Sequence, residues 1–256
     1  MTGYDPARYG NVVGDNYDEL YPGDPAETSA TADTLARLTR ERDPHTLLEL
    51  GIGTGRVALA VQELGIQVAG IDGSQSMIAQ LRAKPEAAEV QVELGDYRDT
   101  RIEATFATVA LLYNGILDPR GPDAQLDIFR NAARHLAPAG RFVVESLVLS
   151  DEHRAGEWWT TPRYVGSEHI ELQFARYDIT TNRIERTLVH LRPAGLQFLT
   201  VTDTYASPAE LDLMATVTGF TLLHRHAGWH GEDYTAHSSR HVSVYELAPA
   251  DPLHPS

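Results

Sequence analysis

A glycine-rich stretch, LLELGIGTGR at residues 47–56, carries the clearest chemical signature in the sequence. Its glycines, Gly51, Gly53 and Gly55, alternate after an apolar run and precede a helical pattern. A strand, a glycine turn and a helix in this order place backbone N–H groups and the positive end of a helix beside a ligand. The stretch therefore predicts a site of the kind that nucleotides and S-adenosylmethionine (SAM) occupy.

The spacing of these glycines separates the two ligand classes. The dinucleotide fingerprint G-x-G-x-x-G would need a glycine at position 56, where the chain has Arg56. The three glycines instead form G-x-G-x-G, which suits a pyrophosphate less well. A turn that serves only to connect a strand tightly to a helix is the structural alternative.

Two acidic residues near the turn also indicate a ligand. Glu49 lies inside the apolar strand before the turn, where a carboxylate is costly unless a cationic ligand, a neighbouring ammonium or backbone amides satisfy it. Asp72 closes the next strand, from which an acidic side chain accepts hydrogen bonds from ribose hydroxyls. The alternatives are a structural partner of a backbone group for Glu49 and a cap of the helix at Ser74 for Asp72.

A third acidic residue follows one strand later, in the segment GDYRD. Asp96 ends that strand, and its carboxylate can accept a hydrogen bond from an adenine amine while Tyr97 packs on the base. An ordinary turn residue is the alternative for Asp96. Four signals in order on consecutive strands predict an adenosyl ligand more specifically than any one of them.

Three tyrosines precede the first long helix. Tyr9, Tyr17 and Tyr21 accompany Arg8 there. Aromatic rings suit a sulfonium cation, and hydroxyl groups suit a carboxylate. The alternative is that these side chains pack the N-terminal helix onto the body of the protein.

The elements that must position these residues alternate along the chain. A helix from about Pro25 to Arg42 comes first, with Leu35 and Leu38 at helical spacing. Strands are then expected at 46–50, 67–71, 89–94, 107–113 and 141–148, and helices near 54–64, 74–84 and 122–136. This order predicts a parallel sheet with crossover helices, and the apolar strands suit a sheet that is covered on both faces.

The pattern changes over residues 158–205, where polar and apolar residues alternate. The segments HIELQFARYDI, RIERTLVHL and LQFLTVTDTY predict an antiparallel insertion of about three strands. A capping box at Ser207 and Glu210 then predicts another helix, and strands near 220–226 and 241–247 follow it.

Composition narrows the classes of partner. The formal charge of −15, from 21 basic and 36 acidic residues, repels nucleic acid and anionic membrane surfaces, so a small molecule is the expected partner. The chain has no cysteine and no N-terminal pattern of a signal peptide, and its apolar runs are shorter than the roughly 18 residues of a membrane span. A cytoplasmic protein without a membrane partner is expected.

The eleven histidines raise the question of a metal site. His224 and His226 would share one face of a strand, and His230 follows them. Because no matching carboxylate cluster accompanies them, no metal is expected.

Taken together, the motifs resemble those of the class I SAM-dependent methyltransferases over about residues 9–148. The first motif of that family matches ELGIGTGR, its second-strand acid matches Asp72 in GIDGSQSMIAQLRAK, and its third-strand acid matches Asp96. The passage HLAPAGRFVVE is similar to the connection from the preceding helix into the fifth strand.

The resemblance implies an α/β, Rossmann-like fold with a seven-stranded, mostly parallel sheet whose last pair is antiparallel. A single domain is expected over residues 1–256, with a lid at about 1–25 that folds over the cofactor. The antiparallel β insertion at about 158–205 would form a roof over the site.

The resemblance also implies roles for individual residues. Tyr17 and Asn114 are expected to be catalytic, and SAM would leave as S-adenosylhomocysteine. The expected cofactor-binding residues are Tyr9, Glu49, Gly51, Gly53, Asp72, Gly73, Met77, Asp96, Tyr97 and Leu112.

More narrowly, ARYGNVVGDNYDELY and RHVSVYEL resemble actinobacterial enzymes of antibiotic biosynthesis, including amine methyltransferases of lincosamide and aminosugar pathways. Such relatives often have an aromatic residue after the fourth strand, where this chain has Leu117, so the acceptor side of the pocket differs. The same segment reads YNGIL and lacks the Asn/Asp-Pro-Pro-aromatic run of enzymes that methylate nucleic-acid bases.

Methyl transfer from SAM to an amine of a small natural-product-like molecule is thus the expected function. O-methylation of a small molecule and a SAM-binding protein of the same fold without transferase activity remain the alternatives. A homo-oligomer and a monomer both remain open.

Overall fold

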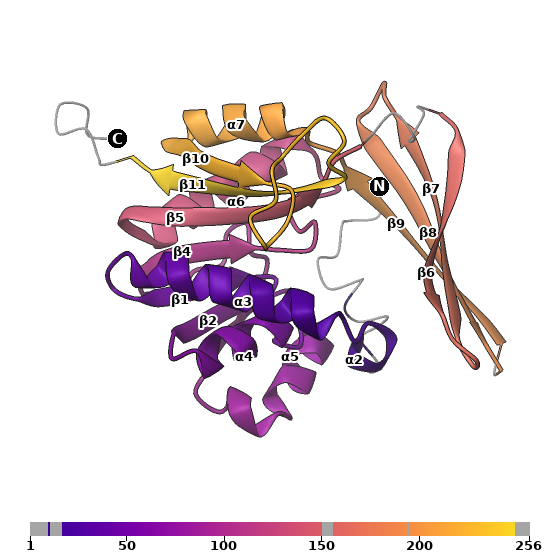
Figure 1. Ribbon diagram of the computed structural model, residues 1–256, viewed down its shortest axis with the longest axis horizontal. Helices are drawn as coiled ribbons and strands as arrows, with labels where there is room; N and C mark the ends of the chain where they lie inside the picture. Colours follow the sequence, from indigo (N-terminus) through magenta and orange to yellow (C-terminus); the bar gives the residue numbers. More distant parts are fainter. Residues whose placement is uncertain (1–9, 11–16, 150–155, 194, 249–256) are drawn as a thin grey trace.

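The computed structural model describes residues 10, 17–149, 156–193 and 195–248, and two sheets organise them (Figure 1). The larger sheet has seven strands in the order β10-β11-β5-β4-β1-β2-β3. Their bounds are β1 Thr46–Leu50, β2 Gln67–Asp72, β3 Gln91–Leu94, β4 Phe106–Leu111, β5 Leu136–Leu147, β10 Phe220–His226 and β11 Arg240–Leu247. All neighbours pair in parallel except β11, which is antiparallel to both β5 and β10. The predicted Rossmann-like sheet is confirmed.

Helices cover both faces of this sheet. On one face lie α3 (Pro25–Arg40), α4 (Arg56–Glu63) and α5 (Gln75–Arg82), and on the other α6 (Pro122–His135) and α7 (Pro208–Val217). A 3-10 turn, η2 (Pro85–Ala87), follows α5, and the short helix α2 (Tyr17–Leu20) precedes α3. Every residue of β4 is buried, as expected for a strand between two helical layers. No helix of the described residues is long and apolar enough to cross a membrane.

The sequence patterns located most element ends to within a few residues. At α7, the predicted capping box is present, with Ser207 Oγ accepting from Glu210 N and Glu210 Oε2 accepting from Ser207 N. The predicted strand at 141–148 was too short, because β5 begins at Leu136 and reaches Arg141 through an irregular pairing opposite Phe106–Thr108.

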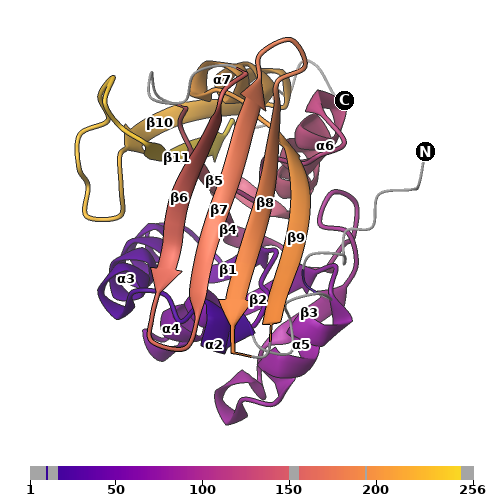
Figure 2. The same cartoon turned by 90° about the vertical axis from the view of Figure 1, so that its right-hand side faces the viewer.

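The smaller sheet is antiparallel and has the order β6-β7-β8-β9 (Figure 2). Its strands are β6 Trp158–Val165, β7 Ile170–Asp178, β8 Arg183–Arg192 and β9 Gly195–Thr204. We call it the roof sheet. Figure 1 shows it standing at the end of the larger sheet towards which the β4 arrow points. The parallel strands therefore end facing it.

The prediction of three strands in this insertion was wrong, because β6 is a fourth. Its sequence, WWTTPRYV, contains Pro162, which cannot donate a hydrogen bond to a neighbouring strand. The strand tolerates this proline at the edge of the roof sheet, beside an irregularity in the pairing between Pro162 and Tyr164. Most of its side chains are exposed, so the polar and apolar alternation that marked the other strands is missing.

Candidate cofactor and acceptor site

The glycine turn connects β1 to α4 at the edge facing the roof sheet. Gly51, Gly53 and Gly55 have φ values of +73°, +56° and +81°, a region that other residues rarely adopt. A Cβ at Gly55 would lie 2.3 Å from a Leu81 methyl carbon, so this glycine serves packing. At Gly51 and Gly53 a Cβ would approach no atom closer than 3.8 Å, so the backbone here is open to a ligand.

Asp72 ends β2 beside this turn. Its Oδ2 accepts a hydrogen bond from Gly53 N at 2.8 Å, and its Oδ1 accepts one from Ser74 N at 2.8 Å. Burial raises the pKa of Asp72, although both backbone hydrogen bonds lower it. The carboxylate thus joins the glycine turn to the start of α5. Gly73 follows it, partly exposed.

Glu49 is the least satisfied acid at this edge. Its side chain is buried in β1, and within the described part of the chain Oε2 has no hydrogen-bond partner. Burial raises the pKa of Glu49 to about 8, while the Ala58 amide and the Arg56 charge lower it and Asp72 raises it further. A cationic group placed here would convert a costly buried acid into a paired carboxylate.

The predicted adenine contact, Asp96, is already engaged in an ion pair. Arg120 hydrogen bonds with both oxygens of Asp96 and also with Asp118. Arg98 N donates to Asp96 Oδ1 at 3.0 Å. Burial raises the pKa of Asp96, but these hydrogen bonds outweigh burial, and the net shift is downward. A ligand amine would have to share this carboxylate with Arg120.

Tyr97 lies next to the open side of the turn. Its ring carbon Cε1 is 3.8 Å from the position of a Cβ on Gly51, and its hydroxyl donates to Gly115 O at 2.9 Å. The ring therefore borders the space in front of Gly51, as a base-packing residue must. Leu112, at the end of β4, is buried.

Sequence reasoning missed two residues at this edge. The guanidinium carbon of Arg56 lies 5.6 Å from the ring centroid of Tyr17 and 5.4 Å from that of Tyr113. Burial raises the pKa of Tyr17, and it raises the pKa of Tyr113 to about 12. The signal for Arg56 was its place directly after the third glycine of the turn, whereas Tyr113 carried no local signal.

Asn114 holds the ends of two strands together. Its Oδ1 accepts from Leu147 N at 2.7 Å, and its own N donates to Glu145 O at 3.3 Å. Both Asn114 and Tyr113 have positive φ, of +69° and +51°. The side-chain oxygen of Asn114 is thus committed to the backbone of β5, and a catalytic role for this residue stays a prediction.

The helix α2 is tied to the glycine turn. Asp18 Oδ1 accepts from Thr54 Oγ1 at 2.6 Å, and Lys84 Nζ lies 2.6 Å from Asp18 Oδ2 and donates to Thr54 O at 2.8 Å. Gly10 lies nearby, because its carbonyl accepts from Ser76 Oγ at 3.0 Å. Tyr9 lies outside the described residues.

The same helix also contacts the roof sheet. Tyr17 and Tyr21 pack against a small cluster formed by Met77 of α5, Leu188 of β8 and Leu199 of β9. Met77 therefore links the helix after Asp72 to the roof. This arrangement brings α2, the glycine turn and the roof sheet together around one edge.

Known proteins share this architecture. Residues 47–140 match a family model described as a methyltransferase domain. The chain is 26% identical over 245 residues to the cypemycin N-terminal methyltransferase of a Streptomyces species, covering 94% of this chain and 98% of that relative. It is 30% identical over 155 residues to a dTDP-4-amino-2,3,4,6-tetradeoxy-D-glucose N,N-dimethyltransferase of Saccharopolyspora spinosa, covering 59% of this chain and 56% of that one.

Among solved structures, the CcbJ methyltransferase from Streptomyces caelestis superposes with a TM-score of 0.87 at 32% identity, over 96% of this chain and 100% of that one. With the glycine turn, the acids of β1 and β2 and the sheet order, these matches define the class. The chain belongs to the class I SAM-dependent methyltransferases.

Proposed function

We propose that this enzyme methylates an amine nitrogen of a small natural-product-like acceptor and releases S-adenosylhomocysteine. One relative is named as an N-terminal methyltransferase of cypemycin, and another as an N,N-dimethyltransferase of a dTDP-linked amino sugar. The single structural observation that carries the cofactor side of the proposal is Glu49, a buried carboxylate whose Oε2 has no hydrogen-bond partner among the described residues. Glu49 lies two residues before Gly51, the first glycine of the turn.

The residues at the turn fit SAM. Gly51 and Gly53 would face the methionyl part with open backbone, and Glu49 would pair with its ammonium group. Asp72 would accept from the ribose hydroxyls with lone pairs left over from its two backbone bonds, and Tyr97 would pack on the base. Arg56 supplies a positive charge suited to the methionyl carboxylate.

When bound, SAM supplies an electrophilic methyl group on a sulfonium. The protein's task is then to hold an uncharged amine about 3 Å from that methyl, in line with its bond to sulfur, and such orientation contributes roughly 7 to 11 kcal/mol. Tyr17 is half-buried and Tyr113 is 48% exposed, and desolvation raises the pKa of each phenol. They therefore remain neutral donors near pH 7 and line the site without acting as bases.

The acceptor would bind between this edge and the inner face of the roof sheet. Strand alternation places Glu171, Gln173 and Ala175 of β7 on the face that is buried, and Phe174 on the exposed face. Gln173 pairs in register with Leu188, which packs near Tyr17. A polar amide beside apolar and aromatic side chains suits a small molecule with both kinds of surface.

We further propose that the N-terminal part, about residues 1–25, covers the bound cofactor within one domain of 1–256. The contacts of α2 with Thr54 and with the roof cluster support this. Cleavage by trypsin within this part should slow when SAM is added. Equal cleavage rates with and without SAM would count against a cover.

The proposed function is tested with a matched set of acceptors. The wild-type enzyme is incubated with methyl-deuterated SAM and a short peptide with a free N-terminus, an amino sugar, and the acetylated form of each. Mass spectrometry should show labelled methyl on the free amines and none on the acetylated compounds. Label on hydroxyl oxygen instead would favour O-methylation. Label on no acceptor, by a protein that binds SAM, would favour a binding protein.

A further inference from the structure

A cluster of potential metal ligands lies in the roof sheet. Glu171 and His190 face each other in register on β7 and β8, and His169 directly precedes β7. His169 Nε2 is 3.4 Å from His190 Nδ1, which is 3.5 Å from Glu171 Oε2. Ligand atoms of the three residues all lie within 4.8 Å of one another.

The two separations measured from His190 Nδ1 match those of ligand atoms around one metal ion, and the third pair, His169 and Glu171, lies within 4.8 Å. In a tetrahedral zinc site with bonds of about 2.1 Å to nitrogen and oxygen, neighbouring ligand atoms lie about 3.4 Å apart. The two imidazole rings are nearly parallel, with 12° between their planes and 5.6 Å between their centroids. The imidazole nitrogens of His169 and His190 could therefore both bind one ion after small side-chain rotations.

Burial and neighbouring charges affect the protonation of the three candidate ligands. Glu171 and His190 are almost fully buried, and His169 is partly buried. Burial lowers the pKa of both histidines, and the Arg192 charge lowers them further. Burial raises the pKa of Glu171, against a hydrogen bond from Tyr21 that lowers it.

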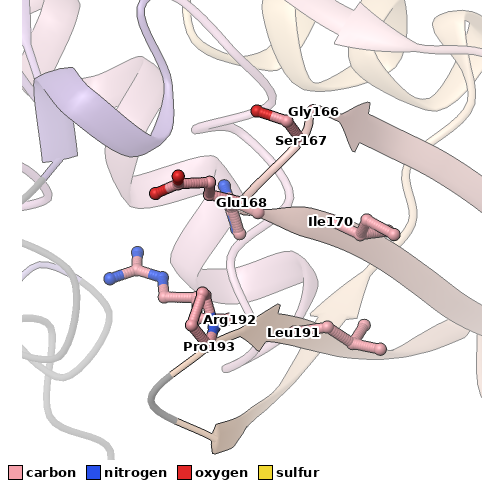
Figure 3. Close-up of a pocket in the computed structure, with 8 residues that line it drawn as sticks. Gly166, Ser167, Glu168, Ile170, Leu191, Arg192 and Pro193 are labelled. Atoms are coloured by element: carbon pink, nitrogen blue, oxygen red, sulfur yellow. The ribbon is translucent and has the colours of Figure 1, made fainter.

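The pocket beside the cluster and the charges around it also affect whether an ion can bind. A shallow pocket of about 220 Å³ adjoins His169, and it is lined by the 166–170 turn and the end of β8 (Figure 3). Figure 3 shows Glu168 and Arg192 extending to the side opposite Ile170 and Leu191. Arg163 lies 4.0 Å from Glu171 and Arg192 is nearby, so an ion must displace or outweigh these cations at the carboxylate.

We propose that His169, Glu171 and His190 bind a divalent transition-metal ion of the zinc class. Three protein ligands leave one coordination position for water. The ion would join the start of β7 to the end of β8, where the ring centroid of His190 lies 6.4 Å from that of Tyr21, and so stabilise the roof sheet. This departs from the expectation, drawn from sequence, that no metal is bound.

His224 and His226, the candidates suggested by the sequence, differ from the roof cluster. The rings of His224 and His226 lie 6.0 Å apart on β10. Within the described ranges, they belong to no group of three close ligand residues, whereas the roof cluster does. A variant of His226 therefore serves as the matched control.

The test is a titration of chelator-treated full-length protein with Zn²⁺ by calorimetry, and with Co²⁺ by visible absorption. The wild type should bind one ion and show the intense visible bands of tetrahedral cobalt. His190→Ala and Glu171→Gln should each weaken zinc binding by about 100-fold or more, and His226→Ala should not change it. Zinc at about 100 times its Kd should raise the Tm of the wild type by about 5 to 10 °C.

His169→Ala keeps the test decisive if a buried variant misfolds, because His169 is partly exposed and its loss should leave the fold intact. It should lose the cobalt bands while its far-ultraviolet circular dichroism stays that of the wild type. Zinc affinity that is equal in His169→Ala and His226→Ala would overturn the proposal, as would a wild type that binds no zinc at micromolar concentration. Methyl transfer by the chelator-treated enzyme is measured separately and should persist.

Discussion

The glycine-turn edge and the roof sheet assemble polar side chains in different ways. At the edge, Glu49 and Asp72 come from the ends of adjacent parallel strands, and the turn between them supplies open backbone. In the roof, Glu171 and His190 meet only because β7 and β8 pair in one particular register. The first arrangement depends on local sequence, and the second depends on how a hairpin aligns. The family match over residues 47–140 includes the edge and does not extend to the roof sheet.

The largest effect is expected at Asp72. Asp72→Ala removes the carboxylate that we assign to the ribose and that also holds Gly53, so SAM affinity should fall by about 1.5 to 3 kcal/mol. Calorimetry measures this, with Asp33→Ala on the exposed side of α3 as the control. If both variants bound SAM as tightly as the wild type, the ribose assignment would be lost.

The second effect concerns Glu49 and pH. Its pKa is about 8 in the folded protein against 4.5 for an unburied glutamate, so the folded state holds the proton more tightly. The stability from this proton is fully present below about pH 4.5 and is lost as the pH rises through 8. Between pH 6 and pH 8, the free energy of unfolding of the wild type should therefore fall by about 2 kcal/mol more than that of Glu49→Gln.

Urea unfolding of both proteins at the two pH values measures this difference. Equal pH dependence would mean that Glu49 has a partner in solution that keeps it ionised. Glu49→Gln should also weaken SAM binding, because an amide cannot neutralise an ammonium group. If Glu49→Gln were both more stable than the wild type and weaker in SAM binding, the result would indicate that Glu49 is retained for binding at a cost in stability.

Substitutions in the roof sheet should change the KM for the acceptor and leave the affinity for SAM unchanged. Gln173→Ala removes an amide from the inner face of β7 and should raise the acceptor KM about fivefold, as the loss of one hydrogen bond does. Its SAM affinity should match that of the wild type. Thr200→Ala, on the exposed face of β9, is the control. A change in SAM affinity in Gln173→Ala would place the cofactor under the roof.

The smallest effect is expected where α2 meets the turn. Lys84 is the only lysine in the chain, so an amine-selective acylating reagent reports on it alone, apart from the N-terminal amine. Asp18→Asn weakens its partly exposed ion pair and should raise the acylation rate of Lys84 a few-fold, with a loss of SAM affinity below about 1 kcal/mol. The N-terminal amine serves as the internal control. An unchanged rate at Lys84 would show that the pair does not persist in solution.

The two regions also differ in how much of them the sequence predicts. The glycines, Glu49 and Asp72 could be predicted as cofactor ligands because a glycine turn between a strand and a helix leaves a local pattern of backbone and charge, and these roles stay a prediction. The engagement of Asp96 by Arg120 could not be predicted, since the two residues lie on different loops and only the folded chain brings them together. The position of Asp96 after its strand could be read from the sequence, but its pairing with Arg120 could not.

The roof was less predictable for the same reason. The alternation of residues indicated strands but not their register, so neither the pair of Glu171 and His190 nor the contact of Tyr21 with them could be foreseen. His224 and His226 are close in sequence, but among the residues that the structure describes they belong to no group of three close ligand residues. The edge strand β6 was missed because Pro162 and its exposed side chains hide the usual pattern.

In the proposed mechanism, the enzyme positions an amine that has already lost its proton, without a protein base. The pH dependence of kcat/KM for two acceptor amines whose pKa values differ by about one unit tests this most directly. We expect two profiles whose midpoints differ by that same amount, each following the ionisation of its own amine. Profiles with one common midpoint would report an ionising group of the protein and contradict it.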